Sequence, residues 1–71
     1  MTTKVNDSDL TKDEIKELRN QMGMTQFEFA VELGTVPNTI LNWENGHFKP
    51  LPVYQEKLKE LRKKVQSEAK K

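Results

Sequence analysis

The stretch TQFEFAVELGTVPNTILNWENG, residues 25–46, contains two short helical patterns with very little chain between them. The first covers residues 26–33, and its inward positions at helical spacing are Phe29, Ala30 and Leu33. Gly34 follows directly and is suited to end a helix in the left-handed conformation. The second pattern begins at Pro37, a favourable residue for a first helical turn, and ends before Gly46. The sequence therefore predicts two helices joined by a tight turn.

Further helices are expected on both sides of this stretch. Residues 12–22 carry an apolar stripe of Ile15, Leu18 and Met22, and the spacing of Thr11 to Glu14 predicts a capping box at their start. Thr25 and Glu28 repeat that spacing before the next helix. From residue 53 onward an a/d-like stripe of Tyr54, Leu58, Leu61 and Val65 predicts an amphipathic, basic C-terminal helix over residues 53–71. Residues 1–9 are polar and aperiodic, which is typical of a flexible leader.

The outer face of the helix predicted over residues 36–45 is unusual. If Ile40 and Trp43 face the core, the opposite face carries three amides and one aliphatic side chain, namely Asn38, Leu41, Asn42 and Asn45. Asparagine can pair with adenine N6 and N7, and leucine can touch a thymine methyl group. Two helices joined by a short, glycine-containing turn are also the sequence form of a helix-turn-helix, whose second helix enters the DNA major groove. The pattern thus favours DNA reading.

Length and composition exclude several classes of protein. A chain of 71 residues supports one small domain and is too small to enclose a deep substrate pocket. It contains no cysteine, so disulfides and thiolate metal sites are excluded, and it has no apolar run long enough for a membrane span or a signal core. His47 is the only histidine, so a metal site or a Ser-His catalytic group would lack its usual partners; a loop position near the DNA backbone is expected for it.

Charge is distributed unevenly along the chain. The formal net charge is only +1. Residues 1–46 carry four Lys or Arg against eight Asp or Glu, a net charge of −4, whereas residues 47–71 carry eight against three, a net charge of +5. Because phosphate neutralisation normally rests on Lys and Arg, the acidic N-terminal part predicts only modest DNA affinity per monomer. The basic tail is interpreted first as a solvated helix face.

The segment IKELRNQMGMTQFEFAVELGTVPNTILNWENGHFKP resembles the Cro/repressor (Xre-type) helix-turn-helix regulators of bacteria and phages. The resemblance spans roughly residues 12–52 and is carried by the TQ pair, the WE pair, three glycines, Ala30 and the closing proline. The resemblance and the helical patterns together imply an all-α fold, a compact bundle of four or five helices. The expected architecture is a lambda-repressor-like DNA-binding domain over residues 10–52 with an extended C-terminal helix.

The resemblance also implies roles for individual residues. Base contacts are expected from Pro37, Asn38, Leu41 and Asn42. Backbone contacts are expected from Thr25, Gln26 and Asn45, and the lysine of the following loop, Lys49, is a further candidate. An arginine of the first helix is expected to pair with the glutamate of the reading helix, here Arg19 with Glu44. Each polar residue also has a plainer interpretation as a solvated surface or first-turn side chain.

Two features depart from the family pattern. Val36 occupies a position where the family usually has a serine or similar residue, so the reading helix should begin with a poor cap. Phe27 and Val31 occupy positions on helix 25–33 that are usually polar, and they should form an apolar patch outside the ordinary core. Either the leader or the long last helix covers this patch, or it contacts a partner or second subunit. The possible protein interface therefore comprises Phe27, Val31, Tyr54, Leu58, Leu61 and Val65.

The sequence thus predicts a transcriptional regulator, most simply a repressor, that binds a pseudo-palindromic double-stranded DNA operator as a homodimer. The alternative is an antitoxin or another protein-interaction regulator that uses the same fold and binds a partner such as a toxin. No enzyme activity, cofactor, metal or membrane association is expected. A cytoplasmic protein of a bacterium or phage fits the lack of cysteine and the family resemblance.

Overall fold

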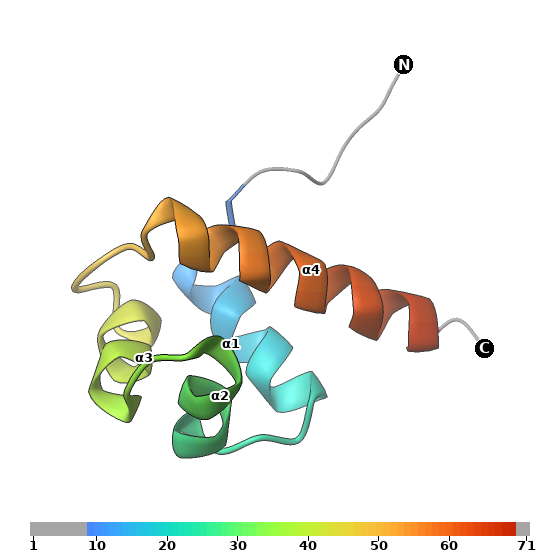
Figure 1. The fold of residues 1–71 in the computed structure, drawn as a ribbon, viewed down its shortest axis with the longest axis horizontal. Coiled ribbons are helices and arrows are strands. Elements are labelled where there is room, and N and C mark those ends of the chain that lie inside the picture. Colours follow the sequence, from blue (N-terminus) through green and yellow to red (C-terminus); the bar gives the residue numbers. More distant parts are fainter. Residues whose placement is uncertain (1–8, 70–71) are drawn as a thin grey trace.

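The computed structural model describes residues 9–69 and has four helices in that range (Figure 1). They are α1 (Lys12–Gln21), α2 (Gln26–Leu33), α3 (Pro37–Glu44) and α4 (Pro52–Ala69). No strand occurs among these residues, so the predicted all-α, four-helix fold is confirmed. The predicted leader falls largely on residues 1–8, which lie outside the described residues.

The helices enclose one core. In Figure 1 the long helix α4 runs along one side of the molecule, α1 lies beneath it, and α2 and α3 lie on the far side of α1. Helix α1 packs against both α3 and α4, and α2 packs against α3. The buried apolar residues come from all four helices and the segment before α1: Leu10, Ile15, Leu18, Phe29, Ala30, Leu33, Ile40, Trp43 and Leu58. Trp43 also contacts Tyr54 of α4, with ring centroids 5.4 Å apart.

Local signals set the first two helix starts. The Thr11 hydroxyl accepts a hydrogen bond from the backbone N–H of Glu14, and the Glu14 carboxylate accepts one from the backbone N–H of Thr11. Thr25 and Glu28 make the same reciprocal pair at the start of α2. Both capping boxes predicted from the sequence are therefore present, and each satisfies two backbone donors that the helix leaves free.

The turn between α2 and α3 is set by Gly34. This residue has a φ of 76°, a left-handed conformation that a side chain would disfavour. The Gly34 N–H donates to the carbonyl of Val31, and the Thr35 N–H donates to that of Ala30, which is the Schellman pattern of helix termination. Only residues 34–36 then separate the two helices, so α3 starts directly against α2.

Helix α4 is anchored to the start of the described chain. Gln55 is a buried polar residue, and its side-chain Oε1 accepts a hydrogen bond of 3.1 Å from the backbone N–H of Leu10. Asp9, the last residue of the predicted leader, forms an ion pair of 3.2 Å with Lys59 of α4. Nε2 of Gln55 also donates to the Leu10 carbonyl at 3.5 Å. The segment that precedes α1 is thus held against α4 by two buried hydrogen bonds and one exposed ion pair.

Helix α3 lacks a side-chain cap, and this gives the first testable prediction. Val36 is the N-cap residue, makes no capping hydrogen bond and is exposed. The variant Val36→Ser is expected to raise the free energy of unfolding by about 1 kcal/mol, because a serine hydroxyl can accept a free N–H of the first turn. For a domain of this size that corresponds to a rise of roughly 4–8 °C in melting temperature.

Val36→Ala is the matched control for this prediction, because it removes the same apolar side chain without supplying an acceptor. Thermal unfolding of both variants measures the effect. A melting temperature for Val36→Ser that is no higher than that of Val36→Ala would show that the first turn of α3 gains nothing from a cap.

Candidate nucleic-acid interface

Helix α3 has one buried face and one accessible face. Ile40 and Trp43 point into the core, with exposures of 0% and 4%. The predicted base-contacting residues lie on the other side: Pro37, Asn38 and Leu41 are exposed and Asn42 is half-buried. The eight-residue helix therefore presents amides and one leucine outward, with no charged residue among them. Such a surface can hydrogen-bond base edges and contact a methyl group without a charge to desolvate.

The start of α2 lies beside this helix. Thr25 is exposed, and its hydroxyl is the N-cap acceptor for Glu28. Gln26 is half-buried, and its Nε2 donates a hydrogen bond of 3.2 Å to Oε1 of Glu44 at the end of α3. The sequence predicted a backbone contact for Gln26 but did not predict this bond. The amide of Gln26 therefore links α2 to α3, and its remaining N–H can donate to a phosphate oxygen.

Glu44 is the centre of a hydrogen-bond network between three helices. Its carboxylate accepts Nε of Arg19 at 2.7 Å and Nη2 of Arg19 at 3.1 Å, a bidentate pair, in addition to the Gln26 amide. The second terminal nitrogen of Arg19 donates to the carbonyl of Met24 at 3.0 Å. Side-chain exposure is only 14% for Arg19 and 4% for Glu44. The structure thus joins the two residues that the sequence paired, and adds Gln26 and Met24.

Hydrogen bonding to Glu44 raises the pKa of Arg19, burial opposes this rise, and the charge of Glu44 adds to it. A folded-state pKa above the unfolded value gives stability that is fully present below the unfolded pKa. Since the ordinary pKa of arginine lies far above neutral pH, the contribution of Arg19 to stability is constant across the physiological pH range. Arg19 therefore stays charged and hydrogen-bonded to Glu44 throughout that range.

The end of α3 gathers the remaining polar candidates. Oδ1 of the Asn42 side chain lies 3.3 Å from Nδ1 of the His47 ring. The backbone N–H of His47 also donates to the backbone carbonyl of Asn42 at 2.9 Å. The contact with the His47 ring orients the Asn42 amide while its nitrogen stays available, and Oδ1 can accept a second hydrogen bond. Asn45, the C-cap residue, and Lys49, in the following loop, are both exposed. These positions extend the polar surface of α3 into the loop.

The structure divides the residues predicted as a protein interface. Phe27 and Val31 are 63% and 64% exposed, so α4 does not cover them. Leu58 is 0% exposed and belongs to the core, so its assignment to an accessible interface was wrong. Tyr54, Leu61 and Val65 are half-buried and pack against the core. The physical reason is that α1 and α2 both contact α4, so the apolar stripe is used within the domain.

The sequence did not predict a second apolar surface, because this surface lies mainly in a loop. Phe48, Leu51 and Val53, in the connection between α3 and α4 and the first turn of α4, are all more than half exposed. Loop residues follow no helical period, so no stripe signals them. The only sequence feature that indicates this surface is the placement of Phe48 and Leu51 on either side of Lys49 and Pro50.

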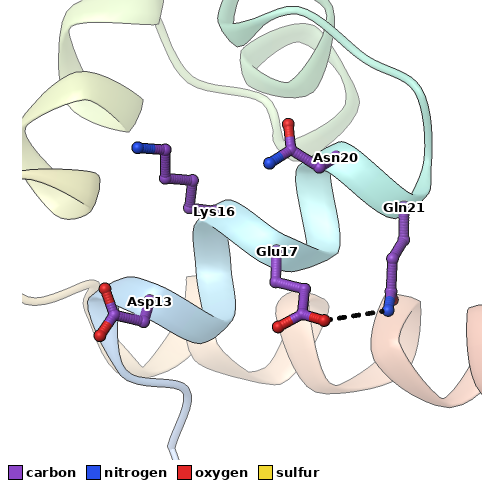
Figure 2. Close-up of a pocket in the computed structure, with 5 residues that line it drawn as sticks. All are labelled: Asp13, Lys16, Glu17, Asn20 and Gln21. Atoms are coloured by element: carbon purple, nitrogen blue, oxygen red, sulfur yellow. Dashed lines mark hydrogen bonds between the residues drawn. The ribbon is translucent and has the colours of Figure 1, made fainter.

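A shallow hollow lies along the outer side of α1, lined by Asp13, Lys16, Glu17, Asn20 and Gln21 (Figure 2). All five residues are exposed and come from this one helix. Figure 2 shows Lys16 and Asn20 pointing to one side and Glu17 toward Gln21, whose Nε2 donates to Oε2 of Glu17 at 3.5 Å. Exposed side chains of mixed charge on one helix face are typical of a solvated surface. The hollow is therefore not a candidate site.

Within residues 9–69, no group of three or more His, Cys, Asp or Glu side chains is placed to hold a metal ion. None of the helices in that range combines the length and apolar character that crossing a membrane requires. The polar surface around α3 therefore remains the candidate site.

Comparison with known proteins agrees with this geometry. A family model described as "Helix-turn-helix" matches residues 15–52, which include most of α1, all of α2 and α3, and the connection to α4. Neither the curated proteins nor the solved structures contain a significant match. The family match covers more than half of the chain and includes every predicted DNA-contacting residue.

Proposed function

We propose that this chain, which belongs to the Xre/lambda-repressor-type helix-turn-helix family of DNA-binding transcription regulators, is a repressor that binds a pseudo-palindromic operator as a homodimer. The observation that carries the proposal is the two-sided character of α3. Ile40 and Trp43 fix one face in the core, while the opposite face presents amides and a leucine to solvent.

In the proposed complex, α3 lies in the major groove. Asn38 and Asn42 offer adjacent donors and acceptors that suit adenine N6 and N7, and Leu41 offers an aliphatic contact to a thymine methyl group. Pro37 stands at the first turn, where its ring is close to the same base edges. The 3.3 Å contact to His47 supports the role of Asn42, because an amide that is already oriented loses less freedom on binding.

Backbone contacts complete the proposed complex. The Thr25 and Gln26 side chains at the N-terminus of α2 face phosphates, where free backbone N–H groups and the helix dipole favour an anion. Asn45 and Lys49 contact the backbone beyond the other end of α3. Few of these groups are charged, so we expect modest affinity for one half-site and a need for two copies.

A repressor needs only to occupy its operator, because a bound protein can block transcription without any further contact. We place this function in the cytoplasm of a bacterium or a phage-infected cell, in keeping with the family. The operator sequence follows from selection of bound duplexes from random DNA.

Substitutions test the proposed contacts. Asn42→Ala is expected to lower affinity for the selected operator by about 1–3 kcal/mol and to change binding to scrambled DNA little, because only matched bases reward the amide. Lys49→Ala should weaken binding to both duplexes and reduce the salt slope by about one, because it removes one phosphate charge. Gln26→Ala should weaken both duplexes with the slope nearly unchanged, since the side chain is neutral. Binding titrations at several salt concentrations measure all three.

Each outcome of these titrations has a definite meaning. Equal loss on operator and scrambled DNA for Asn42→Ala would remove this residue from the base-contacting set. Absence of DNA binding by the parent protein at low salt would refute the proposed function altogether. Because Gln26 bonds Glu44, the melting temperature of Gln26→Ala is measured in parallel, so that lost folding is not read as a lost phosphate contact.

A protein-interaction role, such as that of an antitoxin, is the second candidate function. The exposed pair Phe27 and Val31 on α2 favours it, because two large apolar side chains four residues apart make a continuous patch on one helix face. Co-purification of a stoichiometric partner that is lost on Phe27→Glu, together with unchanged DNA binding by that variant, would support this role. An antitoxin can also bind its own operator, so the two functions are compatible.

A further inference from the structure

The connection from α3 to α4 and the first turn of α4 carry an exposed apolar surface, which we call the loop surface and define as Phe48, Leu51 and Val53. Their exposures are 65%, 63% and 59%. The connection turns at one end of the molecule (Figure 1). Pro50 and Pro52 restrict its backbone, and the Leu51 carbonyl accepts hydrogen bonds of 2.9 Å from the first turn of α4. The apolar side chains are therefore presented by a restrained segment.

A groove adjoins the loop surface. Its apolar lining includes Leu10, Ile15, Trp43, Phe48 and Pro50, and its volume is about 440 Å³. That volume lies in the range of pockets that hold drug-sized molecules, so the groove has room for an aromatic side chain. Phe48 thus stands at the edge of a hollow that it does not fill. A protruding aromatic residue beside a hollow on the same face is what a self-complementary, two-fold interface requires.

We propose that the loop surface is where a second copy of this chain binds, with Phe48 of each copy entering the groove of the other. The proposal deepens the proposed function, because it assigns a surface to the homodimer. Charge supports this occupant: the groove is bordered by Asp9 and Lys12, whose side chains are 70% and 54% exposed, so a two-fold neighbour can place each carboxylate opposite an ammonium group.

The position of the loop surface links the second copy to DNA. Asn45 and Lys49, the proposed backbone contacts beyond the end of α3, are within three residues of Phe48 on either side. A copy bound at Phe48 therefore lies next to the DNA-contacting face and can reach the adjacent half-site.

The size of the loop surface sets the strength of the dimer. Three side chains and one groove offer much less than the roughly 800 Å² per partner that is typical of stable interfaces. The dimer is accordingly weak in free solution and forms fully on DNA, where two neighbouring half-sites raise the effective concentration of one copy for the other.

The experiment compares the parent with Phe48→Glu and with a matched control, Phe27→Glu. Phe27 is 63% exposed, so the control places the same charge at an equally accessible phenylalanine on a different surface. NMR shifts of labelled protein are followed from micromolar to millimolar concentration, without DNA. Stoichiometry and cooperativity on a selected palindrome and on a single half-site are measured by titration and sedimentation.

We expect concentration-dependent shifts in residues 9–12 and 46–53 of the parent and of Phe27→Glu, and their loss in Phe48→Glu. On the palindrome, Phe48→Glu should lose cooperativity at least tenfold. Cooperativity is calculated relative to each variant's own affinity for a single half-site, because a carboxylate next to Lys49 also weakens the contact of one copy with phosphate. Melting temperatures close to that of the parent show that both variants are folded.

Contradicting results are equally specific. Shifts centred on Leu61 and Val65 would move the interface to α4 and overturn the proposal, as would equal cooperativity of Phe48→Glu and the parent on the palindrome. A parent that binds no DNA but still self-associates through residues 46–53 would refute the proposed function and leave this interface standing. A parent that binds DNA as two copies without shifts in that segment, and whose cooperativity is unchanged by Phe48→Glu, would refute this interface and leave the proposed function standing.

Discussion

Glu44→Ala is expected to lower the free energy of unfolding by about 3–5 kcal/mol, the range found when one partner of a buried ion pair is removed. The carboxylate is almost fully buried and accepts three hydrogen bonds, two from Arg19 and one from Gln26. Its loss leaves a largely buried guanidinium and an amide without their acceptor. Thermal or urea unfolding measures the change, and for a domain of this size the melting temperature should fall by more than about 10 °C.

The control for this prediction is Glu60→Ala, which removes an exposed carboxylate from α4. It should shift the melting temperature only slightly. The double variant Arg19→Met/Glu44→Leu should lose less than the two single substitutions combined, because neither charge is left alone. Similar melting shifts for Glu44→Ala and Glu60→Ala would mean that the buried pair contributes no more than a surface charge.

Leu58→Ala is expected to cost about 2–5 kcal/mol, because it empties a fully buried site where α4 meets the core. This result would show that α4 is part of the folding unit. Leu58 also distinguishes the two interpretations of the apolar stripe. If this leucine served only to bind a partner, its truncation would change the monomer's free energy of unfolding very little. Unfolding at low protein concentration separates the monomer's stability from any gain through self-association.

Leu51→Ala is the matched control, since it makes the same chemical change at a leucine that is 63% exposed. Its effect on monomer stability should stay within about 0.5 kcal/mol. The hydrogen bonds at this position use the Leu51 carbonyl, which the substitution leaves in place. If both leucine variants melted together, the packing of α4 on the core would be much looser than the contacts indicate.

Local chemistry made most of the fold predictable. The capping boxes at Thr11 and Thr25 depend on residues three apart, and the turn at Gly34 depends on a single conformation, so each can be recognised in a short stretch. The start of α3 at Pro37 follows for the same reason. The family resemblance supplied the pairing of Arg19 with Glu44, which no local rule contains because the two residues are 25 positions apart.

The features that the sequence did not predict all depend on contacts between residues that are far apart in the sequence. A helical period shows that Leu58 belongs to an apolar face but not that this face is used within the domain. Gln55 reads as an ordinary surface amide until the backbone of Leu10 is seen beside it. Gln26 likewise reads as a free first-turn side chain, although its partner Glu44 lies 18 residues away. Burial of a polar group needs a distant partner, and a sequence does not show distance in space.

The contacts of Glu44 have a consequence for sequence preference. One carboxylate holds α1 and the first turn of α2 to the last turn of α3, so the separation between proposed phosphate contacts and proposed base contacts is fixed before binding. A protein with such a rigid frame cannot adjust to a poorly fitting duplex. The duplex must then change its own twist or groove width, at an energy cost that depends on the stiffness of its base-pair steps. Operators should therefore be selected partly at base pairs that no side chain touches.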